Sequence, residues 1–336
     1  MTDLTPLIQG LNRLLTTGDD DLNEAMAEIS HPDADWYWSD PVGHCAGAQA
    51  SLERLFQPLR SAFGHLHRRP ELFISGDSRV HPGETWVSGF GHFVGNLQAP
   101  LFGLQPHHHL VFLRYGEFYR LVDGKIAEAR IIVDWVDLMR QLGCMPLPME
   151  LGTEMLFPGP ASHDGIRLTD GPGAQDNATV LLVEAMLGDL KAFDPDTFDS
   201  AGQSGEGGYW HRDMLWYGPG GIGSNLSYDG FQKDHRIPFL TAFPDRVGGQ
   251  HYARFGDGPY ACSSGWPSID ATHGGDYLGV PATNRAITMR VMDWWRVEDG
   301  QLIENWVLID FVHLFGQLGV DLFERARERA STDARS

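Results

Sequence analysis

The alternation of apolar and polar positions is clear at residues 289–297, where it predicts a half-buried β-strand. One set of alternate positions is apolar except at a single residue, Asp293. The apolar members of that set are Met289, Val291, Trp295 and Val297. A bare carboxylate in apolar surroundings is costly unless it is paired, hydrogen-bonded or protonated. Asp293 is therefore the first candidate for a functional residue.

The same pattern occurs earlier in the chain, at an offset of 176 residues. Residues 114–143 match residues 290–319 at 11 of 30 ungapped positions, including the final Gln-Leu-Gly of each stretch. Two shorter stretches, 35–43 and 58–63, resemble 213–221 and 238–243. The chain is thus predicted to hold two copies of one domain, at residues 1–143 and 175–330. A proline- and glycine-rich linker at 144–174 would join them.

Each copy predicts the same order of elements. Helical patterns come first, at 5–30 and 175–192, and a short apolar strand follows. A second helix is expected at 48–63 and at 228–243, before three or four long strands. A last helix would begin at Asp134 or Asp310, which suit helix caps better than catalysis. This order predicts an α+β fold in which each copy is a curved antiparallel sheet with helices packed on one face.

The turn at residues 298–300 permits two hairpin registers. A two-residue Asp-Gly loop would put Asp293 on one face with Glu304 and Trp306. A three-residue turn with a bulge at Gly300 would instead set Asp293 across from Asn305. Only the bulged register makes one face apolar in both copies, so we expect it. In the first copy it sets Glu117 across from Ala129 on the same apolar face. The opposite face, with Arg290, Arg296 and Glu304, would carry ion pairs or a domain interface.

The amino-acid composition excludes some classes of binding partner. The formal charge of −20 argues against nucleic acid or an anionic membrane surface, because both require basic patches. The first residues show no signal-peptide pattern, and no apolar segment is long enough to span a bilayer. The three cysteines share no short metal-type spacing, so we expect reduced, buried thiols and a cytoplasmic location.

Two long motifs, residues 218–246 and 273–319, resemble the SnoaL-like polyketide cyclase family. The second includes YLGVPATNR and DWWRVEDGQLIENW. The first copy resembles the family less, with LFGLQPHHH in place of YLGVPATNR. The resemblance implies cone-shaped domains of the NTF2-like superfamily, with a cofactor-free acid/base pocket at the open end of a curved sheet. It implies no particular reaction, because the superfamily includes enzymes and binding modules.

Several residues of the second copy are candidates for this pocket. Asp293 could act as a general base with a pKa raised by its apolar setting, or it could be a carboxylate satisfied by Asn305 or backbone amides. His273 and Asp276 could form a proton-transfer pair, since the first copy has Leu97 and Pro100 there, or they could form a turn with a surface histidine. Asn305 would orient the base. The expected pocket-lining residues are Trp266, Trp295, Tyr277, Tyr209 and His235.

The first copy offers a weaker site, formed by Glu117, His109 and Tyr119. The run of histidines at 107–109 raises the question of a metal ion. His109 and Glu117 are about 26 Å apart on an extended strand, at about 3.3 Å per residue, so one strand cannot bring them together. The spacing therefore argues against a metal ion, and the resemblance to the family implies that no cofactor is used.

Two functions are compatible with this pattern. The first is an acid/base enzyme that acts on a small apolar carbonyl compound, by aldol-type cyclisation or isomerisation. The second is a non-catalytic protein that binds a small molecule or serves as a scaffold. In either case we expect the two copies to pack as an internal pseudo-dimer, and a homodimer of the whole chain stays open.

Overall fold

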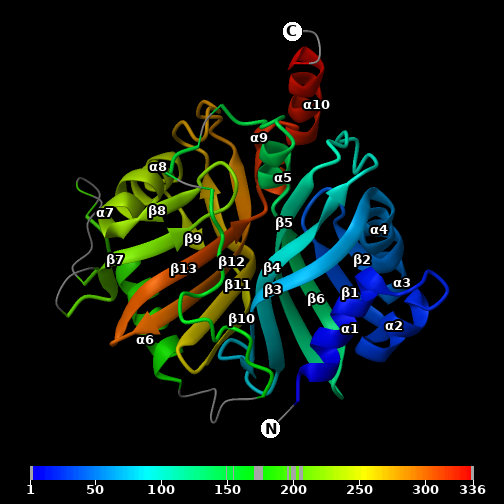
Figure 1. Ribbon diagram of the computed structural model, residues 1–336. Coiled ribbons are helices and arrows are strands. Elements are labelled where there is room, and N and C mark those ends of the chain that lie inside the picture. The colour runs from blue at the N-terminus through cyan, green and yellow to red at the C-terminus, as the bar shows by residue number, and fades with distance from the viewer. Residues whose placement is uncertain are drawn as a thin grey trace.

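The computed structural model describes residues 3–333, apart from 149, 154, 170–176, 195–196, 198–201 and 204–206. Figure 1 shows two domains side by side, each with a sheet turned toward the other and helices on the outside. This arrangement confirms the two α+β domains predicted from the internal repeat. The exact limits of the linker stay a prediction.

The first domain begins with two helices, α1 (Thr5–Thr16) and α2 (Leu22–Ile29). A second helical stretch follows β1 and β2 and consists of α3 (Ala48–Ser51), the π-helical turn η1 (Leu52–Phe56) and α4 (Gln57–Ala62). The sheet has the order β2-β1-β6-β5-β4-β3, and α5 (Trp135–Gln141) follows it. Its strands are β1 (Ser30–Trp38), β2 (His44–Ala46), β3 (Phe63–Asp77), β4 (Thr85–Leu97), β5 (Leu110–Val122) and β6 (Lys125–Val133).

The second domain repeats this order from α6 (Ala178–Leu190) onward. The stretch α7 (Ser227–Phe231), η3 (Gln232–Arg236) and α8 (Ile237–Ala242) corresponds to α3, η1 and α4. Its sheet has the order β10-β11-β12-β13-β7-β8, with β9 paired to β11. The strands are β7 (Trp210–Tyr217), β8 (Ser224–Leu226), β9 (Val247–Gly248), β10 (His251–Asp257), β11 (Tyr260–Thr272), β12 (Ala286–Glu298) and β13 (Gln301–Ile309).

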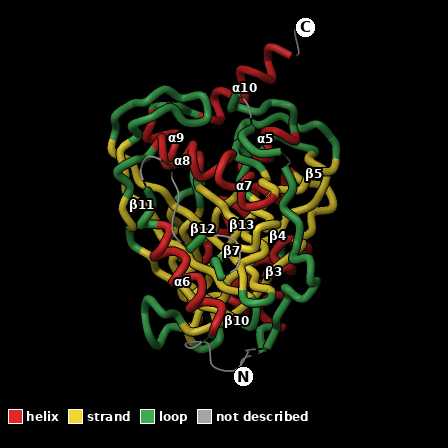
Figure 2. The backbone as a smooth tube through the Cα atoms, turned by 90° about the vertical axis from the view of Figure 1, so that its left-hand side faces the viewer, coloured by secondary structure: helices red, strands yellow, loops and turns green. Residues whose placement is uncertain are grey.

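The chain ends in α9 (Phe311–Leu318) and α10 (Leu322–Asp333). Figure 2, turned by 90°, shows α10 extending beyond the body of the protein. Its first turn nevertheless contacts the first domain, because the Phe323 ring lies 5.9 Å from that of Trp135. The second domain thus ends with a helix that packs on the first.

The predicted turn of the last hairpin is wrong, although the predicted faces are right. Glu298 pairs with Gln301, so the loop has two residues, Asp299 and Gly300, both with positive φ. Such Asp-Gly turns match the twist of paired strands. A bulge at Ile303 then restores the shared face of Asp293 and Asn305.

The bulge moves the cross-strand partners by two residues from those predicted. Asp293 lies across from Val307, and Trp295 lies across from Asn305. In the first domain, Glu117 likewise lies across from Ile131 and not from Ala129. Both acids therefore remain on the face of the sheet that carries the apolar alternation.

The two sheets pack against each other through their other faces, and a buried aromatic cluster fills the space between them. Trp294 is central: its ring contacts Phe90 and Phe118 of the first domain, and its Nε1 donates a hydrogen bond to Ser88 Oγ at 2.8 Å. The predicted ion pair between Arg296 and Glu304 also lies on this face. These contacts form the internal pseudo-dimer expected from the repeat.

Equivalent residues of the two copies make reciprocal contacts across this interface. Asp134 caps α5 by accepting from Asp137 N, and it also accepts from Gly220 N of the second domain at 2.8 Å. Asp310 caps α9 by accepting from His313 N, and it also accepts from Asp40 N of the first domain. The capping role predicted for both aspartates is confirmed, and each also joins the domains.

The three cysteines, Cys45, Cys144 and Cys262, are free and buried, as predicted.

Candidate functional site

The central strand β12 places Asp293 in the middle of the second sheet. Its Cα pairs with Ser263 on β11 and with Val307 on β13. The same face carries Met289, Val291 and Trp295, and α6 packs over β10, β11 and β12 from that side. Asp293 itself is partly exposed, whereas Val291 and Trp295 beside it are buried. Asp293 is thus set among apolar residues on this face of the sheet.

This setting changes the acidity of Asp293. Burial raises the pKa of its carboxyl group from 3.8 to about 7, and both a hydrogen bond with Asn305 and the more distant Arg254 charge lower that pKa only in part. The Asn305 amide is itself fixed, since Nδ2 donates to Trp294 O at 2.8 Å. Near neutral pH, Asp293 can therefore exist in both protonation states.

A polar group of three residues borders Asp293 on the β10 side. Ser263 Oγ accepts a hydrogen bond from Arg254 Nε at 3.2 Å and lies 3.1 Å from His251 Nδ1. Burial and the nearby Arg254 charge lower the pKa of His251 to about 4, so this imidazole is neutral. Arg254 also faces Glu184 of α6 at 3.7 Å. Sequence reasoning missed Arg254 and Ser263, which lie on β10 and β11, outside the hairpin of β12 and β13 whose register was analysed.

Two expected pocket residues carry buried polar atoms that have no hydrogen-bond partner within the described part of the chain. These atoms are Trp295 Nε1 and His235 Nδ1. The His235 ring stacks on Trp216 with centroids 4.2 Å apart, and burial lowers its pKa to about 3, so it is neutral. A buried donor without a partner costs free energy, which a ligand acceptor would recover.

His273 and Asp276 each bond to their own loop. His273 is fully buried, and its Nδ1 accepts from Thr283 N at 3.2 Å. Asp276 Oδ1 accepts from Ala282 N at 3.1 Å and is exposed. Burial lowers the pKa of His273, an effect that the Asp276 charge opposes. These bonds close the loop before β12.

The other expected lining residues lie in three places. Tyr277 is buried against Phe243, and its hydroxyl has no partner in the described residues. Trp266 packs against the aromatic cluster between the domains, with the Arg290 guanidinium 4.7 Å from its ring. Tyr209 precedes β7, where its carbonyl accepts from Leu302 N near the hairpin. The structure therefore brings Asp293, Asn305 and Trp295 together and sets Trp266 apart.

The acid of the first domain is in a closed environment. Arg68 donates to Glu117 Oε1, and the Tyr119 hydroxyl donates to Oε2 at 2.8 Å. The Arg68 and Glu117 side chains are only 2% and 3% exposed. Burial raises the pKa of Glu117, while Arg68 and Tyr119 both act to lower it. His109 is exposed in the loop before β5, far along the strand from this pair.

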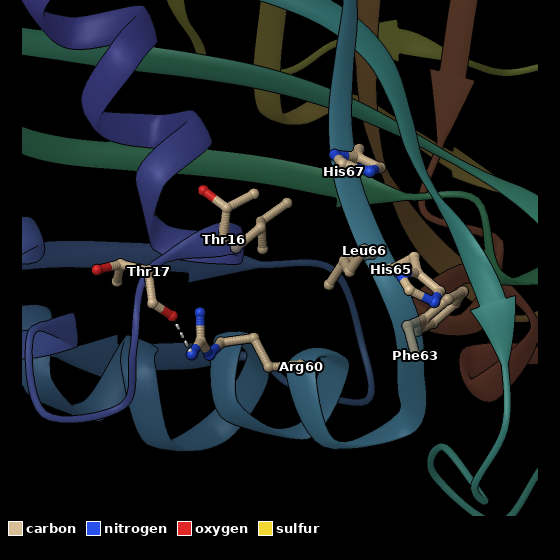
Figure 3. A pocket seen from close by; sticks show the side chains of 8 residues that line it. Thr16, Thr17, Arg60, Phe63, His65, Leu66 and His67 are labelled. Carbon is tan, nitrogen blue, oxygen red and sulfur yellow. Dashed lines mark hydrogen bonds between the residues drawn. The ribbon is translucent and has the colours of Figure 1, made fainter.

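A cavity of about 380 Å³ in the first domain lies between the end of α1 and the start of β3. Figure 3 shows Arg60 pointing at the Thr17 carbonyl there, with His65 and His67 on the opposite side. Arg60 also bonds Leu14 O and Asp19, so its charge is already engaged. This cavity is not lined by Glu117.

Within the described residues, no three metal-ligating side chains gather in a way that could hold a metal ion. His107 and His109 have ring centroids 6.4 Å apart. None of the described helices is both long enough and apolar enough to cross a membrane.

Among solved structures, several single domains are similar to part of this chain. IdmH of Streptomyces antibioticus, described as a candidate polyketide cyclase, is 19% identical over 43% of this chain and 94% of its own, with a TM-score of 0.28. TsrD of Streptomyces laurentii is 17% identical over 43% and 98%, with a TM-score of 0.31. A candidate polyketide cyclase of Acidithiobacillus ferrooxidans is 21% identical over 43% and 96%, with a TM-score of 0.32. Among curated proteins, no sequence matches the chain.

The family comparison covers most of the chain and matches it twice. The model of the SnoaL-like polyketide cyclase matches residues 19–142 and again residues 205–318. Each match contains the whole sheet of one domain, and α1 and α6 lie outside the matched residues. The chain therefore belongs to the SnoaL-like polyketide cyclase family, with two family domains in tandem.

Proposed function

We propose that the second domain is an acid/base enzyme that moves a proton on a small apolar carbonyl compound, in a cyclisation or an isomerisation. The observation that supports this best is Asp293, a partly exposed residue on an apolar face, whose carboxyl group has its pKa raised by burial to about 7. A general base is most effective when its pKa lies near the working pH. Proton transfer from carbon to a carboxylate needs no cofactor.

In this proposal each residue at the site has a separate role. Asp293 removes the proton from the carbon next to the carbonyl group, and Asn305 holds the carboxylate in place. Trp295 forms the wall, and its buried Nε1, which has no partner among the described residues, would donate to a substrate oxygen. His235 and Tyr277 line the apolar interior. We assign His273 and Asp276 to closing the loop and not to proton transfer, because both side chains bond to that loop.

The first domain has a structural role in this proposal. Its acid, Glu117, already has two buried hydrogen-bond donors and therefore no accessible basic oxygen. This difference supplies a matched control. The substitutions Asp293→Asn and Glu117→Gln each remove one carboxylate at equivalent positions of the two sheets.

The test follows the exchange of the α-protons of benzoylacetone for deuterium by NMR. We expect Asp293→Asn to lower the protein-dependent rate by about 10²–10⁴-fold, the usual contribution of a general base. Glu117→Gln should retain the rate if it folds, which circular dichroism would check. Unchanged exchange in folded Asp293→Asn would contradict the proposal. Binding of the diketone without any exchange would favour the non-catalytic binding protein instead.

We also propose the cytoplasm as the location, because three free, buried thiols suit a reducing compartment.

A further inference from the structure

A second cavity, of about 590 Å³, lies where the two domains meet. Figure 1 shows β10 beside β3 in this region. The first domain contributes His81 and Arg130 to its lining, and the second contributes His251, Tyr252, Arg254 and Trp266. The volume is in the range of small-molecule sites. Neither domain alone would enclose it.

Arg130 is held rigidly at this cavity. Its guanidinium carbon lies 4.2 Å from the ring centroid of Tyr252 and 4.6 Å from that of Tyr37, so the planar group lies against both rings. Its Nε donates to Glu128 at 2.6 Å. Within the described part of the chain, that is the only hydrogen bond of this side chain, which is 16% exposed. The two terminal nitrogens are thus available to a ligand.

Arg254 is the second cation of the cavity. Its Nε donates to Ser263 Oγ, and Nη1 lies 3.7 Å from Glu184, which also binds Arg79. The side chain is 20% exposed. Two arginines therefore line one cavity in a chain whose formal charge is −20. Their two carboxylate partners are each shared with another arginine, Glu128 with Arg120 and Glu184 with Arg79.

The cavity also has an aromatic wall. Tyr252 is buried, and Trp266 is partly exposed. Arg290 lies over the Trp266 ring, which fixes its plane. A ligand that bears both a flat ring and an anionic group would meet aromatic faces and guanidinium donors together. A planar carboxylate fits the guanidinium fork with two parallel hydrogen bonds.

We propose that this inter-domain cavity is a binding site for an aromatic carboxylate. The carboxylate would be bound by Arg130 and Arg254, and the ring would pack against Tyr252 and Trp266. Asp293 does not line this cavity, although Arg254 borders both the cavity and Asp293. Fusion of the two domains would then have created a ligand site that a single family domain lacks.

The test is calorimetric titration of the full chain with naphthoate, with naphthalenemethanol and inorganic phosphate as comparison ligands. We expect naphthoate to bind at least about tenfold more tightly than either, because only it offers both the ring and the carboxylate. Equal binding of naphthalenemethanol would show that the guanidinium groups are not used. Equal affinity for phosphate would show that the cavity binds anions in general and does not recognise the aromatic ring. Either result, or no binding of naphthoate, would overturn the proposal.

Two variants locate the binding. Arg130→Gln should lower the affinity for naphthoate at least about tenfold, because the variant loses a pair of charge-assisted hydrogen bonds. Arg120→Gln is the matched control, because Arg120 also faces Glu128, at 3.7 Å, but does not line the cavity. It should leave the affinity unchanged. Equal effects of the two substitutions would contradict the assignment. Because the readout is binding, it is independent of whether Asp293 is catalytic.

Discussion

The two domains place an acid at the same position of the same sheet and surround it differently. Glu117 on β5 and Asp293 on β12 both lie on the helix-covered face, next to the strand that follows the hairpin. Glu117 is closed off by Arg68 and Tyr119. Asp293 has Asn305 beside it and Arg254 farther away, and it remains partly exposed. The same position of the fold thus holds a buried, ion-paired acid in the first domain and a titratable acid in the second.

The length of the edge strand explains the difference. In the first domain β3 begins at Phe63, so the sheet extends far enough to carry Arg68, which pairs with Phe93 of β4. In the second domain β10 begins only at His251, and β9 adds two residues. The segment of β3 that carries Arg68 therefore has no counterpart in β10, and the arginine of β10 in line with Asp293, Arg254, contacts Ser263 and Glu184. A shorter edge leaves Asp293 without the direct ion pair that Arg68 makes with Glu117, and only the charge of Arg254 acts on it.

The largest expected effect is on the closed acid. Arg68→Met should lower the free energy of unfolding by about 3–5 kcal/mol, because it leaves a buried carboxylate without a cation. Chemical denaturation measures this loss. The double substitution Arg68→Met with Glu117→Gln should recover much of it. A loss below about 1 kcal/mol in the single variant would show that the ion pair does not hold the first domain together.

The next largest effect is the pH dependence of the free energy of unfolding that Asp293 causes. Its pKa is raised on folding, so the folded state binds more protons than the unfolded state between pH 3.8 and about 7. The contribution of Asp293 to the free energy of unfolding is therefore fully present below its pKa in the unfolded state, 3.8. It is lost as the pH rises through its pKa in the folded state, about 7. The cost reaches about 2–4 kcal/mol above pH 7, allowing for partial exposure.

Asp293→Asn removes this ionisation, so the variant should gain stability relative to the native protein by that amount between about pH 4 and pH 8. Thermal melting across this range measures the difference. A constant difference between the two proteins at all pH values would contradict the raised pKa.

A smaller effect concerns Asn305, whose hydrogen bond favours the charged form of Asp293. Asn305→Leu should raise the apparent pKa of Asp293 by about one pH unit, as expected for loss of one hydrogen bond to a charged group. The acid limb of the pH–rate profile for deuterium exchange would move by the same amount. An unchanged limb would mean that Asn305 does not hold the carboxylate.

Most of the fold followed from two features of the sequence. The repeat at an offset of 176 residues predicted two domains, and the alternation around Asp293 predicted which face is buried. The exact turn did not follow, because a loop with a bulge at Gly300 and a two-residue loop with a bulge at Ile303 put the same residues on the same face. Alternation fixes the face of a strand and not its partner.

The site was only partly predictable, because its partners are distant in the chain. Asp293 and Asn305 lie on adjacent strands of one hairpin, so local register placed them on one face. Arg68 is 49 residues from Glu117, and no local pattern indicates that contact. Trp266 was expected to line the pocket of Asp293, but it packs against the aromatic cluster between the domains, on the other face of the sheet from Ser263 and Asp293.

The most direct test of the account is an NMR titration of the protein with carbon-13 label at the aspartate carboxyl groups. The Asp293 signal, identified by its absence in Asp293→Asn, should titrate with a midpoint of about 7. No substrate is needed, so the result depends only on the surroundings of the carboxyl group. A midpoint near the ordinary aspartate value of 3.8 would show that Asp293 is as well stabilised as a surface carboxylate, and would contradict the difference between the two domains.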